Sequence, residues 1–193
     1  PTYMKLASLS LADRAREMSK PEIKSAIMSE SDVPVDQPGS MANMYRLFQT
    51  AAPFLYPLAD PVDYEPDPSL MLGARAATSG QDILSVLYDY LLEQDGAAMC
   101  ALMGGANVHQ SQEVLRQMLV HPETVTGLSD AGAHVTLICD ATMPTTQLTF
   151  WARDRHKGDR IPLEFLVAKQ TARNADLYGL KDRGRLAVGL RAD

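Results

Sequence analysis

The feature that most constrains the fold is an alternation of amphipathic helices with short apolar runs between residues 83 and 128. Residues 83–91 and 112–119 carry apolar side chains at helical spacing, whereas residues 97–103 and 124–128 are runs of strand length. Short apolar runs separated by helices are typical of parallel strands joined by helical crossovers. The chain is therefore predicted to be an α/β protein with a parallel sheet.

The rest of the chain gives weaker local signals. Ser10 and a capping-box pattern over residues 19–22 predict two short helices within the first thirty residues. Residues 44–48 are predicted to form a strand, and the proline-rich residues 54–68 a loop that either covers a site as a lid or is simply solvated. One further helix is expected to begin near Pro162, and another to end at Tyr178 before a glycine stop.

Composition excludes several classes of protein. The 193 residues are 46% apolar with a formal net charge of −6, which indicates a globular chain without the basic surface that binds nucleic acid or anionic membranes. No apolar run approaches the ~20 residues that span a bilayer, and the first residues lack a signal-peptide layout. Two widely separated cysteines make no disulfide framework. We therefore expect a cytoplasmic protein with no membrane and no nucleic-acid partner.

Asp130 is the first candidate catalytic residue. It follows the run 124–128 directly, and small residues then turn the chain toward His134. Enzymes with parallel strands place their catalytic groups where such strands end, and a carboxylate there can transfer a proton. The alternative interpretation is that Asp130 only shapes the turn, since Asp before Ala-Gly is ordinary turn chemistry.

The Gly-Leu-Ser-Asp-Ala-Gly-Ala-His run at residues 127–134 resembles the amidohydrolase superfamily, and within it the D-aminoacylases, or N-acyl-D-amino-acid deacylases. Further matches are Val135, residues 138–140, 182–184 and 189–193. The resemblance implies a (β/α)8 TIM-type barrel, for which ~250 residues are usual. We therefore expect an incomplete C-terminal part of such a barrel in residues 1–180. Residues 181–193 would start the connection to a small β domain.

The resemblance also implies the chemistry. Such enzymes hydrolyse the amide of N-acyl-D-amino acids with one or two metal ions, commonly zinc. Asp130 would be the general base and acid on a metal-bound water, and a possible metal ligand. A catalytic zinc needs about three protein ligands, whereas this chain has four histidines and no His-x-His. The other ligands are thus expected outside this chain, which alone would be inactive.

Two residues are candidates for binding the substrate. His134 stands where several deacylases have a histidine, and Asn107 matches an asparagine that ends the preceding strand in these relatives. Both residue types are equally compatible with loop and turn roles.

Some relatives also carry an arginine that grips the substrate carboxylate, where this chain has Thr145. Arg153 or Arg155 would replace it only if the loop folds back; the basic run 153–157 is most simply a solvated helix end. Cys139 is not the metal-binding cysteine of the deacylases, which lies upstream of the matched region. A local metal site of Asp130, His134, Cys139 and Asp140 fits no familiar zinc spacing.

Two other functions remain open. One is a cyclic-amide hydrolase of the hydantoinase or dihydroorotase type, and the other is a non-catalytic barrel fragment with a binding or assembly role. An incomplete barrel leaves an open edge with uncovered backbone and apolar groups. Besides an N-acyl amino acid substrate, the expected partner is therefore a second copy of the chain or a complementary N-terminal segment.

Overall fold

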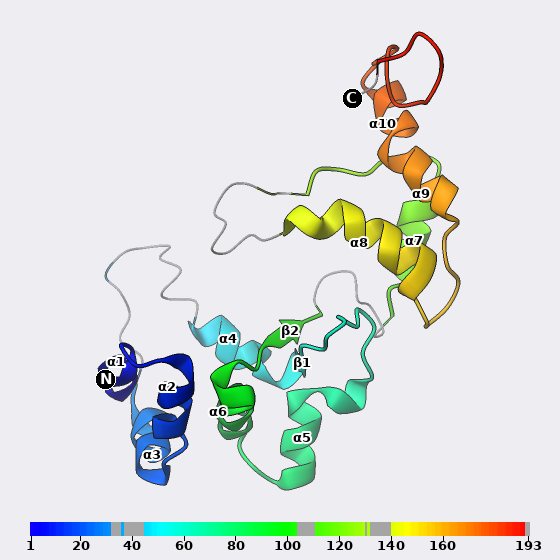
Figure 1. Cartoon of the computed structure of the whole chain (residues 1–193). Coiled ribbons are helices and arrows are strands. Elements are labelled where there is room, and N and C mark those ends of the chain that lie inside the picture. The colour runs from blue at the N-terminus through cyan, green and yellow to red at the C-terminus, as the bar shows by residue number, and fades with distance from the viewer. Residues whose placement is uncertain (32–35, 37–44, 104–110, 130, 132–139, 192–193) are drawn as a thin grey trace. The chain divides into compact units, whose positions relative to one another are not determined.

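The computed structural model describes residues 1–31, 36, 45–103, 111–129, 131 and 140–191 (Figure 1). The chain divides into two compact units, residues 1–105 and 106–193. In the part described, both units are mainly helical, and a two-stranded sheet lies in the first. Helices with a small sheet are consistent with part of an α/β domain.

The first unit begins with three short helices: α1 (Thr2–Leu6), α2 (Leu11–Met18) and α3 (Pro21–Ser29). Ser10 caps α2 as predicted, because its hydroxyl accepts a bond of 3.2 Å from the Asp13 backbone N–H. The capping box predicted at residues 19–22 is wrong. The Ser19 hydroxyl instead donates to the Ala15 carbonyl of the preceding helix, so α3 begins after Lys20 without a side-chain cap.

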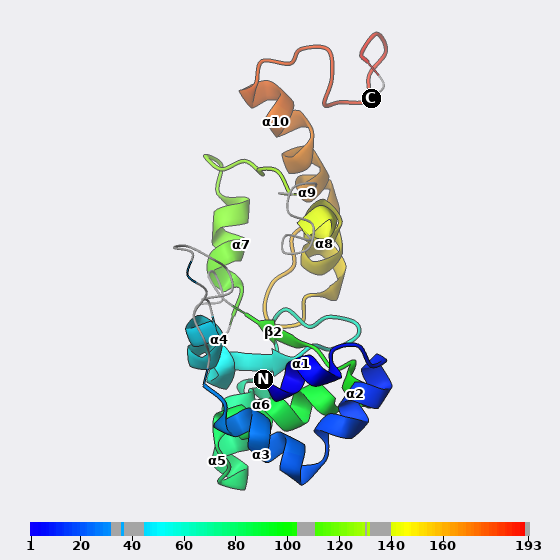
Figure 2. The ribbon, with the colours of Figure 1, turned by 90° about the vertical axis from the view of Figure 1, so that its left-hand side faces the viewer.

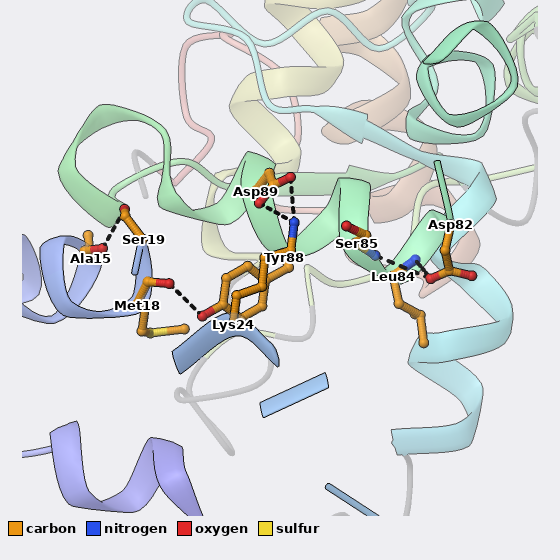
Figure 3. A network of polar contacts seen from close by, with 9 residues as sticks. All are labelled: Ala15, Met18, Ser19, Lys24, Asp82, Leu84, Ser85, Tyr88 and Asp89. Carbon is orange, nitrogen blue, oxygen red and sulfur yellow. Dashed lines mark hydrogen bonds and ion pairs between the residues drawn. The ribbon is translucent and has the colours of Figure 1, made fainter. Parts of the chain in front are cut away.

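The helix predicted at residues 83–91 is confirmed as α6 (Ile83–Leu92). Two contacts fasten it to the N-terminal helices (Figure 3). The Tyr88 hydroxyl donates to the Met18 carbonyl at 2.9 Å, and the Lys24 ammonium lies 2.7 Å from both oxygens of Asp89. These long-range bonds place α2 and α3 side by side with α6, as two views of the ribbon agree (Figures 1 and 2).

The segment between α3 and α6 differs from the sequence prediction. The strand expected at residues 44–48 is wrong, since residues 45–51 are helical. Good helix formers such as Arg, Leu, Gln and Ala in this stretch outweigh its aromatic residues. The proline-rich loop is interrupted by a short strand, and an unpredicted helix follows it. The elements are α4 (Tyr45–Ala51), η2 (Ala52–Phe54), β1 (Leu55–Pro57), η3 (Pro68–Leu70) and α5 (Leu72–Ser79).

The sheet pairs β1 with β2 (Cys100–Leu102), which comes after α6 and η4 (Gln94–Gly96). The pairing is antiparallel, with Leu55 opposite Leu102. The prediction of a parallel partner for the run 97–103 is therefore wrong. An apolar run indicates burial but not the direction of the neighbouring strand. Beside the ladder, the Met99 carbonyl accepts bonds of 2.8 Å from the Leu58 N–H and the Tyr90 hydroxyl.

The core of the first unit lies between the sheet and helices α5 and α6. Its buried members are Leu72, Val86, Tyr90 and Ala98. Tyr90 thus packs its ring in the core while its hydroxyl holds the start of β2, which explains how a three-residue strand keeps its position.

The second unit contains the helix predicted at residues 112–119, the one predicted near Pro162 and the one predicted to end at Tyr178. All three are confirmed, and Gly179 follows the last in the left-handed conformation, with φ of 68°. The elements are α7 (Glu113–Val120), η6 (Asp140–Thr142), α8 (Met143–Thr149), the π-helical η7 (Phe150–Asp154), α9 (Leu163–Gln170) and α10 (Ala172–Leu177).

The strand predicted at residues 124–128 is wrong. These residues carry no regular secondary structure, and the Leu128 side chain is 83% exposed. In α7, Val114 and Met118, two of the apolar side chains whose spacing predicted this helix, are exposed as well. The described residues thus contain no pair of parallel strands and do not form a barrel.

Residues 178–191 follow α10 as a series of turns (Figure 1). The ion pair of Arg185 with Asp176, at 2.6 Å, ties this segment back to α10. Among the helices that the structure describes, none has the length and apolar character needed to cross a membrane.

Candidate functional site

The predicted catalytic and binding residues Asp130, His134 and Asn107 lie outside the described residues, as does Cys139. Their roles stay predictions. The structure does describe the backbone that leads into this motif, residues 111–129, and the chain that leaves it from Asp140 onward. The described geometry is therefore that of the two flanks of the motif.

A buried lysine holds the flank before Asp130. Lys169 of α9 has no exposed surface, and its ammonium donates to the Thr124 carbonyl and the Thr124 hydroxyl, each at 2.7 Å, and to the His121 carbonyl at 3.3 Å. Burial lowers the pKa of Lys169, and the neighbouring Arg173 lowers it further. The three acceptors match the three donors of an ammonium group.

A second tie lies two residues further along. The Thr126 hydroxyl accepts a bond of 3.1 Å from the Asn174 side-chain amide of α10 and donates to the Lys169 carbonyl at 3.4 Å. Residues 124 and 126 are therefore attached to α9 and α10 by side chains, since no strand ladder is present to hold them.

The flank after the motif is attached to the same helix. The side-chain amide of Gln170 donates to the Pro144 carbonyl and to the Gln147 side chain, each at 2.9 Å. Both acceptors belong to α8, which follows Asp140. Asp140 and Thr145 are exposed. Consecutive residues of α9 thus hold the chain on both sides of the motif.

The two arginines considered as substitutes for a substrate-binding arginine have different surroundings. Arg155 is buried, bonded to Glu113 at 3.1 Å and to the Asp159 carbonyl at 2.7 Å, and lies 5.0 Å from the centre of the Trp151 ring. The expectation of a solvated helix end is therefore wrong for Arg155, because α7 supplies a carboxylate that draws it inward. Arg153 is exposed and pairs with its neighbour Asp154 at 2.6 Å.

A groove of about 1020 Å³ that the sequence analysis missed runs along α9, α10 and residues 180–191. Alanines and arginines are among the residues that line it. The alanines are Ala168, Ala172 and Ala175, and the arginines are Arg183, Arg185 and Arg191. Ala172 and Ala175 lie three residues apart in α10 and share a face of that helix, whereas Ala168 belongs to α9.

The metal expected from the resemblance finds no site in the described residues. Nowhere in residues 1–31, 45–103, 111–129 and 140–191 do three His, Cys, Asp or Glu side chains gather closely enough to hold an ion.

A family model with the description "Amidohydrolase family" matches residues 82–193, more than half of the chain. The matched region begins at the residue before α6 and contains the 127–134 motif together with both of its flanks. No curated protein and no solved structure matches the chain.

Proposed function

The chain belongs to the amidohydrolase family, and from this premise we propose that it is part of a hydrolase that cleaves the amide of N-acyl-D-amino acids. The single observation that carries the proposal is that the family match spans the Gly-Leu-Ser-Asp motif and the helices that hold its flanks. A (β/α)8 barrel of the complete enzyme, to which this chain contributes a part, belongs to the same proposal.

We propose Asp130 as the group that moves the proton. The carboxylate accepts a proton from the attacking water as the water oxygen bonds to the amide carbon. The C–N bond then breaks, and Asp130 returns the proton to the leaving nitrogen, so that a carboxylic acid and a free amino acid result. One group that acts first as base and then as acid needs a stable position relative to both the water and the nitrogen.

Zinc, in one or two ions, is part of the proposal through the family resemblance. When bound, zinc lowers the pKa of its water toward 7. Beyond a possible contact with Asp130, its ligands would come from residues that the structure does not describe or from other polypeptide. His134 and Asn107 are proposed to contact the substrate beside Asp130.

The test is an assay of the complete enzyme on N-acetyl-D-methionine, its L isomer and a hydantoin, with zinc removed and restored. We expect hydrolysis of the D substrate, and a drop in kcat of about 10² to 10⁴ for Asp130→Asn. Asp140→Asn is the matched control, because Asp140 is an exposed carboxylate ten residues further on. Equal activity of Asp130→Asn and wild type would refute the proposed role.

The same assay separates the other functions. Opening of the hydantoin ring without cleavage of the linear amide would identify a cyclic-amide hydrolase. Absence of hydrolysis of every amide by the complete protein would favour a binding or assembly role. Metal-dependent hydrolysis by the 193-residue chain alone would contradict our expectation that this chain needs a complementary segment.

We also propose that the chain associates with a second copy or with such a segment. Leu186 and Val188 are fully exposed, and Leu177 is more than half exposed. Apolar side chains gathered on one segment favour association. Light scattering after gel filtration that shows only a monomer would contradict this.

A further inference from the structure

We propose that Lys169 and Gln170 of α9 are positioning residues, which hold the two flanks of the chain that carries Asp130. The inference rests on the proposed function for its catalytic part. It assigns a task to a buried lysine that forms no part of the predicted site.

The burial of Lys169 requires an explanation. A lysine side chain is rarely buried without compensation, because the ammonium loses its hydration. Here all three donors go to residues 121–124, at distances of 2.7 to 3.3 Å. All three ammonium donors thus bond to two carbonyls and one hydroxyl within residues 121–124, a short stretch that ends six residues before Asp130.

The network continues beyond the lysine. The Thr124 hydroxyl lies 2.6 Å from the Met118 carbonyl of α7, to which it donates while it accepts from Lys169. Thr124 therefore links α9 to α7. This fixes the start of the segment from two sides.

Within the segment, the Thr126 hydroxyl is bonded to the Asn174 amide and the Lys169 carbonyl. Residues 124–129 carry no regular secondary structure, so a sheet ladder does not fix their register. On the other flank, Gln170 bonds residues 144 and 147 in the same way. One turn of α9 therefore sets the position of both flanks, and a shift of that turn would move Asp130 relative to its substrate.

The bonds of Lys169 and Gln170 to the two flanks, which we call the clamp, are tested first without any activity measurement. Amide ¹⁵N relaxation is measured on the 193-residue chain for wild type, Lys169→Met and Thr124→Val. Lys181→Met is the control, because Lys181 is an exposed lysine of the same unit. We expect order parameters at residues 125–128 to fall from about 0.85 to below about 0.6 in both test variants, and to stay unchanged in the control.

Helical content by circular dichroism shows whether each variant folds. Thr124→Val keeps the buried lysine and removes one of its three acceptors together with the hydroxyl bond to the Met118 carbonyl, so it decides the question if Lys169→Met does not fold. Order parameters that stay at the wild-type value in a folded variant would overturn the clamp.

The catalytic part is tested on the complete enzyme by steady-state kinetics. We expect Lys169→Met to lower kcat by about 10- to 100-fold with KM changed less than about twofold, since small displacements of a catalytic group cost rate rather than binding. Added to Asp130→Asn, Lys169→Met should cause no further loss, because it acts through the carboxylate that is already gone.

Full kcat in Lys169→Met, or a loss that adds to that of Asp130→Asn, would overturn the positioning role while leaving Asp130 as the catalytic group. If instead Asp130→Asn itself retains full activity, the proposed function fails and the catalytic part of this inference fails with it. The relaxation data test the clamp in either case, because they do not depend on activity.

Discussion

Replacement of Arg155 by Met should destabilise the second unit, whereas the same replacement of Arg153 should not. Arg155 has essentially no exposed surface, and Arg153 is 71% exposed although it stands only two positions earlier. Methionine keeps much of the apolar stem and removes the guanidinium, so the pair of variants isolates what burial does to the charged group.

The magnitude follows from the contacts of Arg155. Its bond of 2.7 Å to the Asp159 carbonyl contributes roughly 1.5–3 kcal/mol, as for hydrogen bonds that involve a charged group. The contact with the Trp151 ring contributes about 0.5–2 kcal/mol. Glu113 keeps Arg116 as a partner, so no isolated charge is left behind. We expect Arg155→Met to lower the free energy of unfolding by about 2–4 kcal/mol.

Urea unfolding followed by tryptophan fluorescence is the assay. Trp151 is the only tryptophan of the chain, so the signal reports on the unit that contains Arg155. With a slope of about 2 kcal/mol per molar urea, the midpoint should fall by about 1–2 M in Arg155→Met. Arg153→Met should leave it unchanged within error.

Equal midpoints for the two variants would refute this reasoning, because burial would then not distinguish the two guanidinium groups. A changed slope would instead indicate that the unfolded or native state itself had changed, and the comparison would have to be repeated by calorimetry.

Three further predictions concern local features. Asp82→Ala should cost about 1 kcal/mol, since the Asp82 carboxylate accepts bonds from two N–H groups at the start of α6 (Figure 3), whereas Asp82→Asn should be neutral in thermal unfolding. Gly184→Ala should lower the free energy of unfolding by about 2 kcal/mol, because its φ is 87° and an added Cβ would lie 2.6 Å from the Ala175 Cβ. Gly189→Ala, where φ is similar but the surrounding space is open, should lower it by only about 1 kcal/mol. Equal melting temperatures of the two variants would contradict this. The Arg185 guanidinium lowers the pKa of Asp176, so this pair stabilises the fold above the ordinary carboxyl pKa of 3.8 and ceases to do so as pH falls through the lowered value. Acid titration should accordingly show a smaller loss of stability below pH 4 in Asp176→Asn, and identical curves would disprove the contribution.

Local signals predicted the helices of the chain well where one or two residues determine an end. Ser10 caps α2 by a bond within three residues, as predicted, and Gly179 stops the chain after α10 because it adopts a positive φ. The same kind of reasoning failed at residues 19–22, where Ser19 found an acceptor in the preceding helix instead of the following one.

Apolar runs were less informative, because they indicate burial without naming a partner. The run 97–103 forms only β2, and it pairs antiparallel with a strand more than forty residues away. The run 124–128 forms no strand, and Leu128 is exposed. Periodicity therefore did not justify the predicted parallel sheet, and the sheet in the described residues is antiparallel.

By itself, the sequence determined both ends of α6 and α7 and one end of α2, α9 and α10, and the motif at residues 127–134 indicated the family to which the chain belongs. Only the tertiary structure decided that Arg155 is buried against Glu113 and that Lys169 holds residues 121–124. The physical reason is distance along the chain: a cap needs a neighbour three residues away, whereas Glu113 and Thr124 lie more than forty residues from Arg155 and Lys169 and reach them only when the chain has folded.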